Sequence, residues 1–312
     1  MITLTELSKV LNLSKERAKQ LTDEALLRNP GLTIEKGTVW RLGEDLVGEI
    51  IKSRGITLPK SKVITMKSQK GGIGGSTLLL NTAIYASKFF PVLVMDFDPE
   101  NHATNFLLEE NVDFKNLKCI YDIYSENKQI EEGIVKTRYP NIDILPSALR
   151  NHKIERLLSN QNPKKLLRAK IDQIKKEYGL ILIDLPPSIN TLTGSAYLTA
   201  DLIVLPCIPS VFALESVGLT IETIEKLAQD FEAPKRNYKI IYNQFNSKRV
   251  ASQEVLSALL NSYSSMVYPF YIKESTEVLN SLNAGKSVFE IKGAKETKTD
   301  FTSLALSVMG FE

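Results

Sequence analysis

Continuous apolar runs alternate with longer, helix-forming stretches through residues 62–312. The runs are "KVITMKS", "PVLVMDFD", "LILIDLPP", "LIVLPCIP" and "KIIYNQF", and "STLLLNTAIYASKF" is a typical stretch between them. Strands that are apolar at nearly every position are buried on both faces, as in parallel sheets covered by helices. The pattern therefore predicts an α/β fold with a mostly parallel, doubly wound sheet. In such folds ligands bind at the carboxyl ends of the strands.

Residues 1–51 show the pattern of a small, mainly helical domain. Thr3 and Glu6 fit the capping box of a first helix, and Ser14 is placed to cap a second helix after the turn "LNLS". The stretch "GLTIEKGTVWRLGEDLVGEII" predicts a hairpin, or wing, followed by a closing helix. This order is typical of a winged helix-turn-helix, although a dimerisation module with a solvated charged face would share it. The basic residues 52–61, broken by a glycine and a proline, predict a linker before a large domain at 62–312.

Composition narrows the class of protein. Of the 312 residues, 43% are hydrophobic and 24% charged, enough for a sizeable core, and the net charge of +3 permits a nucleic-acid partner without indicating one. Cys119 and Cys207 lie far apart without metal-ligand spacing and are expected to be reduced thiols. We see no signal segment and no apolar run as long as a membrane span, so we expect a cytoplasmic protein.

The stretch "KGGIGGST" at residues 70–77 is close to a phosphate-binding P-loop, G-x-x-x-x-G-K-[ST], and it lies between a strand and a helix as a P-loop must. Gly75 occupies the place of the P-loop lysine, whereas Lys70 stands at the head of the run. Backbone N–H groups in such a loop turn inward around phosphates, and a turn without a ligand is the alternative. Ser76 takes the place of the hydroxyl that binds Mg²⁺. The expected nucleotide-binding residues are Gly71, Gly72, Ile73, Gly74, Gly75, Ser76 and Thr77.

Three aspartates follow two of the apolar runs. Asp96 and Asp98 come at the end of the second predicted strand, and Asp184 ends the third. Carboxylates near a polyphosphate can support Mg²⁺ and position an attacking water. Two residues apart, Asp96 and Asp98 would point the same way in an extended chain, so we expect this pair to serve the metal and the attacking water. Asp96 and Asp184 are the aspartates that we expect to help hold the metal.

The order of these motifs resembles the ParA branch of deviant Walker A P-loop ATPases, which includes relatives of MinD and Soj. "KGGIGGST" is similar to the family pattern K-G-G-x-G-K-[ST]-[ST], and "DFDPENHAT" to D-x-D-P-Q-x-N-A-T. The stretches "IDLPPSINTLTGSAYLTADLIVLPCIPSVFALESV", "NQFNSKRVASQEVL" and "LNAGKSVFE" resemble later segments of the family. The resemblance covers roughly residues 62–312.

The resemblance implies roles for individual residues. Lys70 matches the lysine that reaches the partner's phosphates in a nucleotide-sandwich dimer, Asp98 the aspartate that supports the hydrolytic water, and Asp184 a magnesium ligand acting through water. Asn243 matches a position that contacts the base. The implied cofactors are ATP or ADP and Mg²⁺, and the implied function is segregation of plasmids or chromosomes.

The family also implies partners: a second copy of the chain, non-specifically bound DNA of the nucleoid, and a ParB-like protein that stimulates hydrolysis. By position, the residues for non-specific DNA are Lys248, Arg249, Lys273 and Lys286, although solvated lysines would look the same. Larger members carry an N-terminal helix-turn-helix that binds their own operator. Its recognition helix would contribute Lys15, Arg17, Lys19 and Gln20.

Gly75 departs from the family pattern, and its lack of charge predicts weak nucleotide binding with slow or absent hydrolysis. Gly75 is either an introduced substitution or natural divergence, and the sequence does not separate the two. Glu100 and His102, where the family usually has Gln and Asn, are consistent with natural divergence. A membrane-bound MinD-like ATPase fits poorly, because the C-terminal stretch "DFTSLALSVMGFE" has no basic residue. A nitrogenase-type iron protein would need cysteines that bind its cluster, and Cys119 and Cys207 are poorly placed for that. The main alternative is a non-enzymatic DNA-binding regulator that uses the ATPase fold to dimerise.

Overall fold

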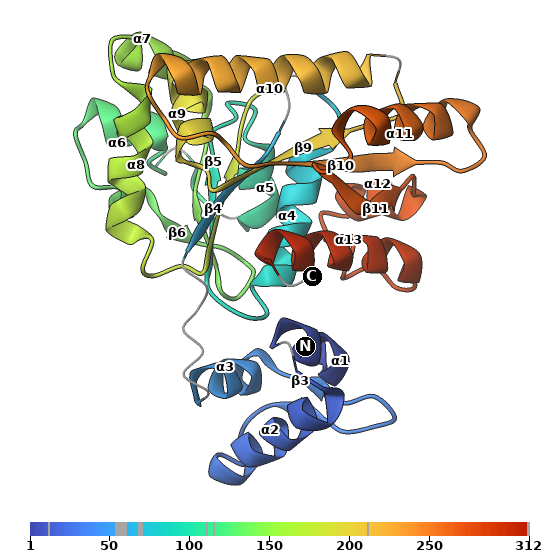
Figure 1. Ribbon diagram of the computed structural model, residues 1–312. Helices are drawn as coiled ribbons and strands as arrows, with labels where there is room; N and C mark the ends of the chain where they lie inside the picture. Colours follow the sequence, from blue (N-terminus) through green and yellow to red (C-terminus); the bar gives the residue numbers. More distant parts are fainter. Residues whose placement is uncertain are drawn as a thin grey trace.

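The computed structural model describes residues 1–11, 13–53, 61–67, 71–109, 112–114, 116–210 and 212–310. Its centre is an eight-stranded sheet with the order β11-β10-β9-β4-β8-β5-β7-β6 (Figure 1). Every neighbouring pair is parallel except β6 and β7. The mostly parallel sheet predicted from the apolar runs is confirmed. Its strands are β4 (Lys62–Met66), β5 (Val92–Asp96), β6 (Val135–Lys136), β7 (Ile142–Leu145), β8 (Leu180–Asp184), β9 (Leu202–Cys207), β10 (Tyr238–Phe245) and β11 (Val267–Lys273).

Helices cover both faces of the sheet. Successive residues of a strand point to opposite faces, so each strand contributes to two hydrophobic cores. Val63 and Ile181 join one core, and their neighbours Ile64 and Leu182 join the other. The first core packs against α6 (Ile120–Ser125), α7 (Ile154–Leu158), α8 (Pro163–Ile174), α9 (Thr191–Thr199), α10 (Ala213–Asp230) and α11 (Val250–Tyr263). The second packs against α4 (Gly75–Ala86), α5 (His102–Leu107), α12 (Thr276–Asn283) and α13 (Lys295–Met309). Two short 3₁₀ turns, η1 (Ile130–Gly133) and η2 (Leu149–Lys153), lie in the connections.

The N-terminal unit contains three helices and a small antiparallel sheet of order β1-β3-β2. The predicted capping box is present: Thr3 N–H donates to Glu6, and Glu6 N–H donates to the Thr3 hydroxyl. Ser14 caps the second helix, and the predicted hairpin and closing helix are also found. The elements are β1 (Ile2–Thr3), α1 (Leu4–Val10), α2 (Lys15–Arg28), β2 (Ile34–Glu35), β3 (Arg41–Leu42) and α3 (Glu44–Ser53).

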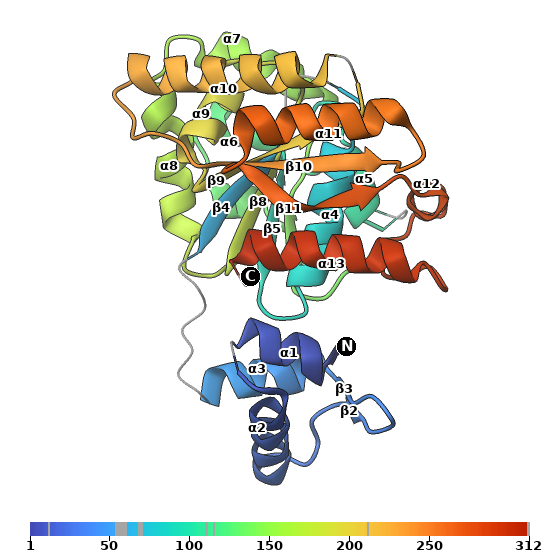
Figure 2. The ribbon, with the colours of Figure 1, turned by 45° about the vertical axis from the view of Figure 1, so that its right-hand side comes forward.

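The N-terminal unit contacts the large domain beside α4 and α13 (Figure 2). The Tyr85 hydroxyl, near the end of α4, donates a 2.9 Å hydrogen bond to Glu6 Oε1 of α1. Tyr85 is fully buried, and its ring packs against Phe89 and Phe289. Burial, reinforced by the Glu6 charge, raises the pKa of Tyr85 above its usual value, so the hydroxyl keeps its proton as donor. The helix that begins at the glycine-rich loop therefore ends on the N-terminal unit.

No helix in the described part of the chain is both long and apolar enough to span a membrane. The predicted linker falls mostly outside the described residues, so the domain limits remain predictions.

Candidate functional site

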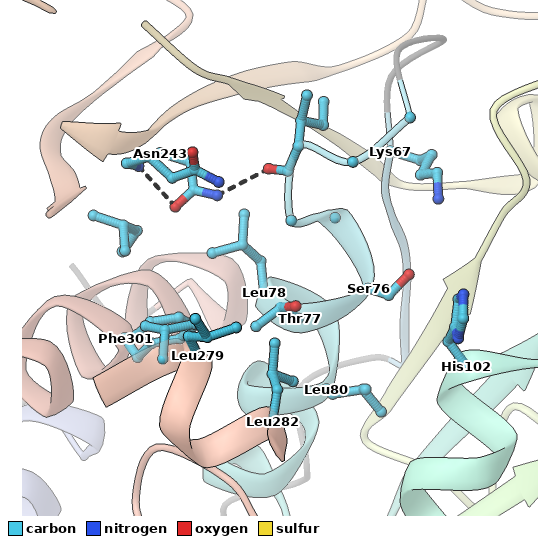
Figure 3. Close-up of a pocket in the computed structure, with 18 of the residues that line it drawn as sticks. Lys67, Ser76, Thr77, Leu78, Leu80, His102, Asn243, Leu279, Leu282 and Phe301 are labelled. Carbon is cyan, nitrogen blue, oxygen red and sulfur yellow. Dashed lines mark hydrogen bonds between the residues drawn. The ribbon is translucent and has the colours of Figure 1, made fainter. Parts of the chain in front are cut away.

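A cavity of about 820 Å³ opens at the carboxyl ends of β4, β10 and β11. The glycine-rich loop forms its floor, as expected for ligands of a parallel sheet. Figure 3 shows Lys67, Ser76 and His102 on one side of α4, and Leu279, Leu282 and Phe301 on the other. The cavity thus has a polar part beside the loop and an apolar part formed by α12 and α13.

The loop leads directly into α4, and its backbone is shaped for an anion. Gly72 and Gly74 have φ values of 72° and 86°, the left-handed region that glycine adopts without strain. Gly74 precedes the helix and provides no side-chain cap. The first N–H groups of α4, beginning at Gly75, therefore lack a side-chain acceptor, and a phosphate at this end would satisfy them.

Ser76 and Asp184 meet under the loop. The Ser76 hydroxyl donates a 3.0 Å hydrogen bond to Asp184 Oδ1, whereas Asp184 Oδ2 is buried without a hydrogen-bond partner. Burial raises the pKa of Asp184, and the Lys67 ammonium and the Ser76 hydroxyl oppose that rise. A buried carboxylate oxygen without a donor, beside a serine hydroxyl, fits the needs of Mg²⁺. That ion is held by few protein oxygens and completes its shell with water and phosphate.

Asp96 and Asp98, which we expected to act together, have different surroundings. Asp96 is fully buried: its Oδ1 accepts from Asp98 N–H, and its Oδ2 accepts from both N–H and Oγ1 of Thr104. Hydrogen bonds from the residues that follow β5 thus occupy both carboxylate oxygens of Asp96. Asp96 does not line the cavity. Asp98 lines the cavity and is within 3.7 Å of the Lys67 ammonium. Of the two, the geometry favours Asp98 as the residue that acts on a ligand.

Lys67 is a cavity residue that the sequence did not single out. It directly follows β4, and its ammonium faces the same carboxylate-lined space as the Ser76 hydroxyl (Figure 3). The available signal was its place: a lysine at the carboxyl end of the strand that precedes the loop. A single lysine at a strand end belongs to no motif, so the glycine-rich pattern does not predict its role.

Gly75 has no room for a side chain in this conformation. A Cβ atom added there would lie 2.6 Å from the carbonyl oxygen of Met66 and 3.2 Å from Lys67 Cδ. The end of β4 and the Lys67 side chain thus occupy the space that a lysine at position 75 would need. Replacing the glycine by lysine alone is therefore not a clean restoration of a P-loop.

Asn243 lies at the cavity, as expected, and is engaged with the loop. Its Nδ2 donates a 2.9 Å hydrogen bond to the carbonyl oxygen of Ile73. The close approach explains Gly74, since a Cβ there would be 2.6 Å from Asn243 Nδ2. Asn243 therefore supports the loop, and contact with a base stays a prediction.

The remaining predicted residues are spread over the surface. Lys70 lies outside the described residues. Lys248 and Lys286 are exposed, while Arg249 pairs with Glu274 at 3.0 Å and Lys273 with Glu296 at 2.8 Å. These pairs lower the local positive charge available to DNA.

In the N-terminal unit, Lys15 and Gln20 of α2 are exposed. Arg17 forms a 3.4 Å ion pair with Glu24, and the Lys19 ammonium lies 5.0 Å from the centre of the Trp40 ring. The second helix therefore carries the predicted polar residues, and two of them also contact their own domain.

A family model described as an AAA domain matches residues 61–238. An uncharacterised protein of Methanocaldococcus jannaschii is 30% identical over 250 residues, covering 78% of this chain and 96% of that protein. The chromosome partitioning protein ParA of Caulobacter vibrioides is 26% identical over 232 residues, covering 73% and 86%. The structure of a Cyanothece McdA variant in complex with ATP aligns with a TM-score of 0.73 at 18% identity, covering 81% of this chain and 98% of that one, a likeness in fold. The chain therefore belongs to the AAA domain family, and it is similar to chromosome partitioning proteins.

Proposed function

We propose that this chain is a partition protein that binds ATP and Mg²⁺ in the cavity and pairs with a second copy in that state. The observation that carries the proposal is the convergence of the uncapped start of α4, the Ser76 hydroxyl, the unpartnered Asp184 oxygen and Asp98 at one edge of the sheet. Donors for phosphate, oxygens for a metal and a carboxylate for water are the parts that phosphoryl transfer needs.

Each part has a separate role. The N–H groups of residues 71–77 bind phosphate oxygens, and Ser76 and Asp184 hold the metal. Mg²⁺, when bound, neutralises charge on the phosphates. Asp98 orients the attacking water, and Lys70 reaches the partner subunit's nucleotide. Because residue 75 is a glycine, we propose that hydrolysis is slow compared with a P-loop that contains its lysine.

The DNA-binding part of the proposal concerns the C-terminal half. Lys248 and Lys286 are exposed and would contact phosphates of non-specific DNA, while Arg249 and Lys273 would first have to leave Glu274 and Glu296. We propose that a ParB-like protein stimulates release, and that α2 of the N-terminal unit reads an operator through Lys15, Arg17, Lys19 and Gln20. Phosphate contacts of the first kind give a steep dependence on salt.

Titration calorimetry with ATP and Mg²⁺, followed by light scattering, tests the core of the proposal. We expect binding in the micromolar to millimolar range and a doubling of mass with ATP but not with ADP. Asp184→Asn should remove the dependence of binding on Mg²⁺. If correctly folded protein binds no adenine nucleotide at millimolar concentration, the proposal fails.

The second candidate function is a non-enzymatic DNA-binding regulator. It is favoured by Gly75, because the structure has neither the P-loop lysine nor the space for it. The regulator would bind operator DNA equally well with ATP, with ADP and without nucleotide, whereas a partition protein would not.

A further inference from the structure

A P-loop needs a buried positive charge next to the β- and γ-phosphates, and position 75 cannot supply it. Without such a charge, Asp98 and Asp184 would repel a triphosphate, since both carboxylates lie at the polar part of the site. The site therefore needs another lysine or arginine whose charge reaches the same space.

Lys67 is the one lysine or arginine that is buried within the described ranges. Its side chain is 10% exposed and lines the cavity together with the loop. Among the described residues, the other lysine that lines the cavity is Lys273, which is exposed and pairs with Glu296. A buried ammonium is costly without a partner, so the position of Lys67 needs an explanation.

The only ion pair of Lys67 in the described structure is a long one. Its Nζ lies 3.7 Å from Asp98 Oδ2, beyond the 2.7–3.2 Å that N–H···O hydrogen bonds typically span. The ammonium is therefore near carboxylates but keeps its donors available for a stronger acceptor. Phosphate oxygens at the start of α4 would be such an acceptor.

The Lys67 stem also fills the space that residue 75 leaves. Its Cδ would lie 3.2 Å from a Cβ at that position, so a lysine at 67 and a lysine at 75 compete for one volume. A glycine at 75 is what allows the chain from β4 to pass this close to the loop, because the Met66 carbonyl oxygen is closer still.

We propose that Lys67 is the phosphate-binding cation of this site: it replaces the P-loop lysine from the end of β4, and exchanges Asp98 for the β- and γ-phosphates of a bound nucleoside triphosphate. The inference rests on the nucleotide-binding function proposed above. The inference changes the expectation of slow hydrolysis that follows from Gly75, because Lys67 supplies the positive charge that position 75 lacks. It also ties Asp98, the water-orienting residue, to the arrival of the nucleotide.

Lys67→Met tests the inference, since methionine keeps the length of the stem and removes the charge. Lys62→Met is the matched control: Lys62 begins the same strand, does not line the cavity, and donates to the carbonyl oxygen of Met309 at 3.1 Å. Calorimetry measures the affinity of each variant for AMP, ADP and ATP with Mg²⁺. Circular dichroism establishes that both variants fold.

We expect Lys67→Met to weaken ATP binding roughly 30-fold or more, as for removal of one member of a buried charge pair. AMP binding should change less than about threefold, because AMP lacks the β- and γ-phosphates that the ammonium would bind. Lys67→Arg should keep the preference for ATP over AMP, and Lys62→Met should match the wild type. Lys67→Gln, which keeps a polar end beside Asp98, is the substitute if methionine does not fold.

Two results overturn the inference in different ways. If the wild type binds ATP and Lys67→Met binds it equally well, with the same preference over AMP, Lys67 is not the cation, although the proposed function stands. If the wild type binds none of the three nucleotides, the proposed function fails and this inference fails with it.

Discussion

Gly75→Ala measures how closely the end of β4 packs on the glycine-rich loop. The added methyl group would lie 2.6 Å from the Met66 carbonyl oxygen, and the two atoms must separate by about 0.8 Å to reach the 3.4 Å at which ordinary contact begins. Lys67 Cδ, at 3.2 Å, belongs to a flexible side chain and can yield, but the Met66 oxygen is backbone. The strand end or the loop must therefore move.

The two energy terms have opposite signs. Overpacking of this kind costs about 1–3 kcal/mol, while alanine in place of glycine at a helix start returns at most about 1 kcal/mol. We expect the free energy of unfolding to fall by roughly 1–2 kcal/mol. Urea unfolding followed by circular dichroism measures it; fluorescence is unsuitable, because the single tryptophan, Trp40, lies in the N-terminal unit.

Gly71→Ala is the matched control within the same loop. A Cβ at Gly71 would meet nothing within 4 Å, so we expect a change of less than about 0.5 kcal/mol. If Gly75→Ala proves as stable as Gly71→Ala, the close packing of Met66 on the loop is refuted. Position 75 would then also have space for a lysine.

Three further predictions concern buried polar groups. Asp184→Asn should raise the melting temperature of the metal-free protein, because it removes a buried charge with an unpartnered oxygen, and should abolish the stabilisation that Mg²⁺ adds to that by ATP alone; a lower metal-free melting temperature would contradict this. Burial, aided by repulsion from Asp184, raises the pKa of Asp96 from 3.8 to about 8, so the native state holds this proton more tightly than the unfolded chain. Stability in a chelator should therefore fall as the pH rises from about 4 to about 8 and level off above 8, and a melting temperature that is flat from pH 5 to 8 would be evidence against it. Tyr85→Phe removes the hydrogen bond to Glu6 and should weaken docking of the N-terminal unit by about 1–3 kcal/mol, seen as faster hydrogen exchange in α1; unchanged exchange there would rule out a role for this bond.

Sequence patterns located the inner part of the sheet and missed its edges. The five apolar runs became β4, β5, β8, β9 and β10, whereas β6, β7 and β11 were not predicted and lie at the two sides of the sheet. Inner strands are buried on both faces and so are apolar throughout, which is a strong signal. The outer strands carry less of this apolar signal: β6 has only two residues, and β11 is only partly buried.

The candidate site shows the same division. Local motifs located residues 71–77, Ser76 and Asp184 at the carboxyl ends of the strands. A glycine-rich turn and the ends of parallel strands meet there whatever the rest of the chain does. Position at a strand end and spacing predict that Asp96 and Asp98 point the same way. Asp96 instead accepts hydrogen bonds from Thr104, eight residues away, an environment that spacing does not contain.

By itself, the sequence determined what depends on neighbouring residues: the helix caps at Thr3 and Ser14, the buried strands, and a glycine-rich loop between a strand and a helix. Tertiary structure alone decided which side chains share a space, namely Lys67 with Asp98 and with the volume beside Gly75, and Glu6 with Tyr85. Local backbone preferences act over a few residues and leave a readable pattern. Packing and charge pairing join residues up to 79 positions apart in these pairs, and they exist only once the sheet has brought its strand ends together.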